Sequence, residues 1–93
     1  MNMTVKTVEE YVRFLESKGF QLKEDAIGFI YFGKHYTNAG DELVNAALEL
    51  TLKIQKSFDG SFYMSLLEML TTHGIKNRQE AIQFVKEKHL LAI

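Results

Sequence analysis

Apolar residues recur at helical spacing along most of the chain. The clearest repeat runs from Val8 to Leu15, with charged side chains on the opposite side. Thr7 and Glu10 have the Thr-x-x-Glu spacing of a capping box, in which each side chain accepts from the other residue's backbone N–H. Gly19 follows the last turn, where a glycine readily takes the left-handed conformation that ends a helix. The pattern predicts a first helix between Thr7 and Gly19.

Residues 26–33 form a short apolar run that is compatible with either a strand or a helix. Aromatic and β-branched residues dominate it, which favours a strand. However, Glu24 and Asp25 precede it, and acidic side chains stabilise a helix N-terminus. No other segment predicts a strand that could pair with this one, and a lone strand is not stable. A helix over residues 24–35 is therefore expected.

Three further helices are expected in the second half of the chain. Thr37 or Asn38 is placed to cap the first of them, and Ser61 the next. Asn77 and Glu80 repeat the capping-box spacing before the last. The five expected helices span residues 8–18, 24–35, 39–57, 62–73 and 78–91. The fold class is thus all-α, a compact bundle of four to five short helices in a single domain over residues 1–93.

The composition is that of an ordinary folded protein, with 46% hydrophobic and 25% charged residues. Proline is absent, which leaves the chain free to be helical throughout. Cysteine is absent too, which excludes disulfides, thiolate nucleophiles and zinc–thiolate sites. The first ten residues do not resemble a signal peptide, and no stretch has the ~18 uncharged apolar residues of a membrane span. A cytoplasmic protein is expected, without membrane contact.

A formal net charge of −1, from 11 basic and 12 acidic residues, gives no electrostatic reason for a nucleic-acid partner. One segment nevertheless has the spacing of a phosphate-binding loop, Gly28-x4-Gly33-Lys34. His35 stands where that motif needs Ser or Thr, and the four intervening residues are bulky and apolar. We expect a packed helix there and no cofactor.

The ionisable residues do not form a recognisable catalytic or metal motif. The three histidines, His35, His73 and His89, lack the i, i+3 or i, i+4 spacing of a helical metal site. His73 is expected instead to interact with carbonyl groups at a helix C-terminus. No catalytic residue, metal ligand or cofactor-binding residue is assigned, and the protein is expected not to be an enzyme.

Aromatic residues gather in one short stretch that contains Phe29, Phe32 and Tyr36. They cannot all face one core from a single helix, unless that helix is buried on every side. Phenylalanine and tyrosine are enriched at protein interfaces. These three residues, together with Leu90 and Leu91 near the C-terminus, are the interaction candidates. The leading hypothesis is a non-enzymatic protein–protein interaction module or regulator that binds an unidentified protein or a second copy of itself.

Two alternatives come from other functional classes. Residues 73–82 resemble the turn and second helix of ribbon-helix-helix repressors, which implies a nucleic-acid-binding regulator that uses the fourth and fifth helices. Residues 58–64 would then form the DNA-reading strand, although they contain no Lys or Arg. The expected phosphate contacts are Lys76, Arg78, Lys86 and Lys88. The other alternative is a ligand-binding or enzymatic helical bundle with a closed polar pocket.

A second resemblance concerns the chain as a whole and is carried by residues 8–20 and 25–52. With these segments, the chain resembles the short uncharacterised helical proteins of Bacillus-type bacteria. That resemblance implies an all-helical fold. It carries no known activity.

Overall fold

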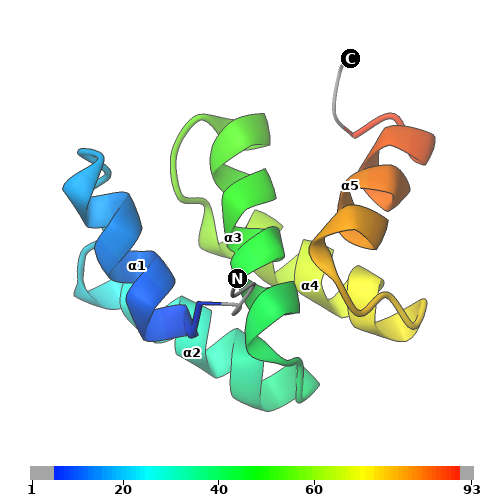
Figure 1. The fold of residues 1–93 in the computed structure, drawn as a ribbon, viewed down its shortest axis with the longest axis horizontal. Helices are drawn as coiled ribbons and strands as arrows, with labels where there is room; N and C mark the ends of the chain where they lie inside the picture. Colours follow the sequence, from blue (N-terminus) through cyan, green and yellow to red (C-terminus); the bar gives the residue numbers. More distant parts are fainter. Residues whose placement is uncertain (1–5, 91–93) are drawn as a thin grey trace, which may run out of the picture.

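The computed structural model describes residues 6–90 and confirms the predicted all-α fold (Figure 1). Residues 26–33 are helical, as predicted, and the described part of the chain contains no strand. The five helices are α1 (Val8–Ser17), α2 (Glu24–Thr37), α3 (Asp41–Gln55), α4 (Gly60–Thr72) and α5 (Arg78–Glu87).

Helix α3 forms the centre of the bundle and packs against each of the other four helices (Figure 1). Nine of its 15 residues are buried, so it has little outward surface. Ala46 and Ala47 are almost fully buried, and their small side chains let neighbouring helices come close. Thr51 is a fully buried polar residue of α3. Its hydroxyl donates to the Ala47 carbonyl at 2.7 Å, so it is hydrogen-bonded within the core.

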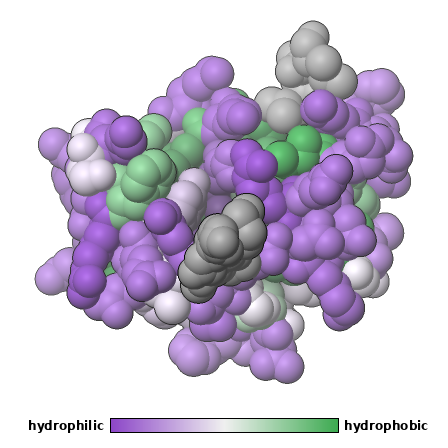
Figure 2. Space-filling model, viewed as in Figure 1, coloured by the Kyte–Doolittle hydropathy of each residue, from purple (hydrophilic) through white to green (hydrophobic). Residues whose placement is uncertain are grey.

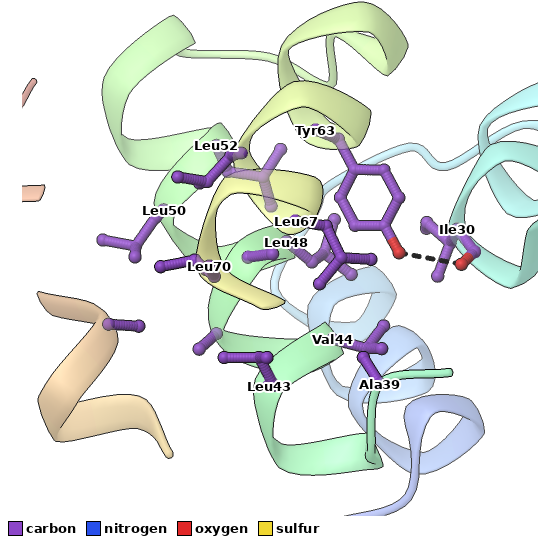
Figure 3. Packing of buried hydrophobic residues seen from close by; sticks show 14 of the residues in the cluster. Ile30, Ala39, Leu43, Val44, Leu48, Leu50, Leu52, Tyr63, Leu67 and Leu70 are labelled. Atoms are coloured by element: carbon purple, nitrogen blue, oxygen red, sulfur yellow. Dashed lines mark hydrogen bonds between the residues drawn. The ribbon is translucent and has the colours of Figure 1, made fainter. Parts of the chain in front are cut away.

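Helices α2 and α4 approach each other closely at Gly33 and Tyr63. Gly33 of α2 faces the ring of Tyr63 in α4, and a Cβ atom at Gly33 would lie 2.8 Å from the ring atom Cε2. The fully buried Tyr63 hydroxyl donates to the Ile30 carbonyl at 2.8 Å (Figure 3). A glycine is therefore required here because the two helices approach across a large aromatic ring.

The local signals at both ends of α1 are confirmed. Thr7 Oγ1 accepts from the Glu10 backbone N–H at 3.1 Å, and the Glu10 carboxylate accepts from the Thr7 N–H at 2.9 Å. Gly19 has a φ of 99°, and Gly74 after α4 has a φ of 72°. Each is followed by an N–H bond back to the helix, which closes the C-terminal turn.

Two predicted N-caps are wrong. Neither Thr37 nor Asn38 caps α3, because Asn38 takes the left-handed conformation (φ 60°) that ends α2, and α3 begins three residues later at Asp41. Ser61 does not cap α4 either. Asp59 does so, accepting from a backbone N–H at 3.0 Å, since its carboxylate is the first side-chain acceptor to meet the open amides.

Helix α5 ends earlier than residue 91. His89 has a φ of 60°, and the Leu90 N–H turns back to bond a carbonyl in the helix. At the other end Asn77 accepts from the Glu80 N–H, as predicted. The Glu80 carboxylate, however, reaches the N–H of Lys76 instead of that of Asn77, so the second capping box is displaced by one residue.

Candidate functional site

The outer side of α2 carries a continuous stripe of exposed residues. At about 100° per residue, these positions fall within roughly one half of the helix circumference. We call this stripe the outer face of α2. It consists of Glu24, Asp25, Gly28, Phe29, Phe32, His35 and Tyr36, all of which are exposed.

Three large aromatic side chains occupy the middle and one end of this face. Phe29 is 44%, Phe32 58% and Tyr36 65% exposed. The rings of Phe32 and Tyr36 stack with centroids 5.7 Å apart, one helical turn from each other. The Phe29 ring packs at 6.4 Å against Phe58, which precedes α4. The aromatics are thus ordered by neighbouring rings while much of their surface faces solvent.

The opposite side of α2 explains why the aromatics point outward. Its buried residues are Ile30 and Gly33, and both contact Tyr63 of α4. Because the Tyr63 hydroxyl and the missing side chain of Gly33 fix that side against α4, the helix cannot rotate its aromatic stripe into the core. The outer face is therefore a consequence of the α2–α4 contact.

A shallow hollow of about 320 Å³ adjoins one flank of the outer face. Asp25 and Phe29 line it from α2, Phe58 lines it from the α3–α4 connection, and Gly60 lines it at the start of α4. Gly60 lies directly under the Phe29 ring, since a Cβ atom there would come within 2.8 Å of it. The hollow therefore has an aromatic wall and one carboxylate at its edge.

The other predicted interaction candidates lie elsewhere. Leu90 follows α5, whose main packing partner is α3, and it is partly buried against the core. Leu91 lies outside the described residues. The structure thus brings Phe29, Phe32 and Tyr36 onto one face and leaves Leu90 apart from them.

Two exposed aromatics outside α2, Phe14 and Phe20, were not among the candidates. Phe14 is 41% exposed, but its ring stacks on Tyr11 and has the Nζ atoms of Lys6 and Lys18 at 5.4 and 5.5 Å from its centroid. Phe20 is also exposed and lines a groove of about 220 Å³ between α1 and α3. Phe14 stands off the apolar stripe of α1, which is the sequence signal that could have identified it.

A charged groove of about 240 Å³ lies where α1, α3 and the start of α5 meet. The Arg78 guanidinium donates two hydrogen bonds of 2.8 Å to the Glu49 carboxylate, which lowers the pKa of Glu49 and raises that of Arg78. Burial, together with the nearby Glu49 charge, raises the pKa of Tyr11 to about 12. The tyrosine stays protonated at neutral pH and the two charges satisfy each other, so this arrangement ties helices together.

Asn45 completes the floor of that groove. Its side-chain amide donates to the Lys6 carbonyl at 2.9 Å and so holds the chain before α1 against α3. Its Oδ1 atom is buried and has no hydrogen-bond partner among residues 6–90. The bond to Lys6 fixes which amide atom is which, since only the nitrogen can donate to a carbonyl.

The segment that has phosphate-loop spacing is part of α2. Its backbone N–H groups lie within a continuous helix, and Gly33 is buried against Tyr63. Lys34 pairs with Asp41 at 3.0 Å and donates to the Ala39 carbonyl, so it fastens the α2–α3 corner. The residues present therefore do not form a phosphate cradle.

The residues that the nucleic-acid hypothesis depends on lie in α4, in α5 and in the connections beside them. Residues 58–64, the segment needed for a DNA-reading strand, form the end of a connection and the first turn of α4. Arg78 is engaged by Glu49, and Lys88 lies over the Phe84 ring at 5.6 Å. His73 contacts the Met69 carbonyl through Nδ1 at 2.8 Å, which confirms its predicted place at a helix C-terminus.

The described residues form neither a metal-binding cluster nor a membrane-spanning helix. Within residues 6–90, no three His, Asp or Glu side chains gather closely enough to hold a metal ion. Over the same residues, none of the helices has the length and apolar character needed to cross a membrane. On the side of the molecule drawn in Figure 2, hydrophilic residues cover most of the surface and separate the apolar patches.

The chain matches one protein family over residues 3–91, nearly its whole length. That family is DUF6123, a family of unknown function. The chain belongs to DUF6123. No curated protein and no solved structure matches it. Membership of DUF6123 therefore brings no activity with it.

Proposed function

We propose that this DUF6123 protein is a non-enzymatic interaction module that binds another protein chain through the outer face of α2. The observation that carries the proposal is the joint exposure of Phe29, Phe32 and Tyr36 on one face. Full burial of a large apolar side chain is worth about 1.5–3 kcal/mol. Three such side chains on one face therefore offer a binding energy that the isolated chain does not use.

The surroundings of the aromatics favour a protein partner. Interfaces between proteins have an aromatic centre and a polar rim, and this face has Glu24 and Asp25 at one end and His35 at the other. The two carboxylates disfavour a nucleic-acid backbone and an anionic lipid surface, both of which repel negative charge. A protein surface is the partner class that tolerates both parts of the face.

Site-specific photo-crosslinking tests the proposal in the cell that makes the protein. A photoreactive phenylalanine analogue replaces Phe32 in one variant and Phe14 in the matched control, since both rings are exposed. We expect a discrete protein adduct from position 32 that survives nuclease treatment, and none of the same kind from position 14. Equal labelling from both positions, or none from position 32, would contradict the proposal.

A further inference from the structure

The residues on the outer face of α2 are arranged as an interface between two copies of the chain requires. Resting on the proposed function, we propose that the outer face of α2 binds the same face of a second copy, with the two helices antiparallel about a two-fold axis. A two-fold interface must be self-complementary. If one residue of the first copy contacts a second residue of the other copy, the second residue of the first copy also contacts the first residue of the other. The outer face of α2 satisfies that condition in charge, in shape and in the position of a glycine.

The charges are arranged for an antiparallel pair. Glu24 and Asp25 lie in the first turn of α2, and His35 lies in the last. Within residues 6–90, no ion pair or side-chain hydrogen bond engages any of these three. A parallel pair would place carboxylates beside carboxylates. An antiparallel pair places them beside histidine and opposes the two helix dipoles, which is favourable.

Helical spacing also sorts the face into two flanks on either side of Phe32. Glu24, Gly28 and His35 lie on one flank. The other flank has Asp25, Phe29 and Tyr36. In antiparallel packing about a two-fold axis each flank meets its own equivalent, so His35 of the second copy comes to the Glu24 flank and Tyr36 of the second copy to the Asp25 flank.

The Asp25 flank has a space that fits the incoming tyrosine. The hollow of about 320 Å³ opens beside Asp25 and is walled by Phe29 and Phe58. Tyr36, the most exposed large hydrophobic side chain within residues 6–90, enters it from the second copy with its ring against Phe29. Its hydroxyl then donates to the Asp25 carboxylate. By symmetry the same contact forms twice.

Gly28 supplies an independent observation. Glycine in the middle of a helix is unfavourable, and the other helical glycines, Gly33 and Gly60, are explained by rings that press against them. Apart from its own helix backbone, a Cβ atom at Gly28 would meet no atom of residues 6–90 within 4 Å. Nothing in this described part of the chain requires a glycine there, whereas a second helix that packs on this flank needs the room.

Sedimentation velocity of the full chain over a wide range of concentration tests the proposal. We expect a reversible dimer. Phe32→Glu should raise its dissociation constant by about a hundredfold or more, whereas Phe14→Glu, at a matched exposed ring, should leave it unchanged. Circular dichroism would verify that both variants keep their helices. A wild-type chain that is monomeric throughout, or a dimer that survives Phe32→Glu, would overturn the proposal.

A charge exchange tests the antiparallel arrangement itself. Glu24→Lys and His35→Glu should each weaken the dimer about two- to fivefold, and the double variant should restore it. A double variant weaker than either single one would refute the arrangement. The crosslinking at position 32 separates this inference from the proposed function. An adduct with a different protein from a monomeric chain would sustain the interaction module and reject the second copy, while the absence of any adduct would reject both.

Discussion

Gly33→Ala is the substitution that most directly tests the packing behind the outer face of α2. The new Cβ atom would lie 2.8 Å from Cε2 of Tyr63 and 3.0 Å from Sδ of Met64. The methionine side chain is flexible and can yield. The tyrosine cannot, because its ring is fully buried and its hydroxyl is bonded to the Ile30 carbonyl.

Two opposing terms set the change in the free energy of unfolding that Gly33→Ala causes. Replacing glycine by alanine inside a helix gains about 1 kcal/mol of helix propensity. An extra carbon in a packed core costs about 1–3 kcal/mol, and the rigid ring places this site in the upper part of that range. The net expectation is a loss of about 1–2 kcal/mol in the free energy of unfolding, which for a chain of this size lowers Tm by roughly 5–15 °C.

Urea unfolding at low protein concentration measures that loss, with Gly28→Ala as the matched control in the same helix. The Gly28 variant has open space around the new atom and should gain up to about 1 kcal/mol. In a Tyr63→Leu background the penalty at Gly33 should vanish, since the ring is gone. A Gly33→Ala variant as stable as the wild type, or an unchanged penalty without the ring, would refute the reasoning.

Two further predictions concern the rest of the bundle. Lys56 ends α3 with a φ of 69°, a backbone conformation that glycine adopts more easily than lysine, so Lys56→Gly should raise the free energy of unfolding by about 0.5–1 kcal/mol. Lys53→Gly, inside the same helix, should lower it by about 1 kcal/mol. Thermal unfolding that ranks the two variants otherwise would contradict this prediction. The Arg78 hydrogen bonds lower the pKa of Glu49, so the pair stabilises the fold fully above the ordinary carboxyl pKa of about 4.3 and ceases to do so as the pH falls through the lowered value. Because the pair is partly exposed, Glu49→Gln should cost at most about 1 kcal/mol at pH 7 and little in acid; an equal loss at both pH values in denaturant titrations would argue against the linkage.

The parts of the fold that depend on neighbouring residues could be predicted from the sequence. Thr7 and Glu10 define the start of α1 through bonds between residues three apart, and Gly19 defines its end. The start of α3 could not be predicted in this way. Asn38 is as good a cap for a helix N-terminus as it is a residue for the left-handed conformation, and only the packing of α2 decides between the two uses.

The same distinction between local and distant interactions applies to the candidate site. The clustering of Phe29, Phe32 and Tyr36 could be recognised from their spacing in the sequence. Their exposure could not, because residues 26–33 are apolar on nearly every side and give no preference for which side is buried. That preference comes from the contact between Gly33 and Tyr63, which are 30 positions apart and share no local signal.

The packing of the other helices leaves the outer face of α2 free to contact another molecule. Helix α3 already contacts all four of its neighbours and supplies much of the core, so the bundle does not need the aromatic side chains of α2 to close it. Tyr63 contacts α2 on its buried side, through Gly33 and Ile30. A polar outer face would serve the folding of this chain equally well. These exposed rings lie next to a glycine at which an added Cβ atom would have open space among residues 6–90, and both features are better explained by the surface of a second molecule than by the stability of the first.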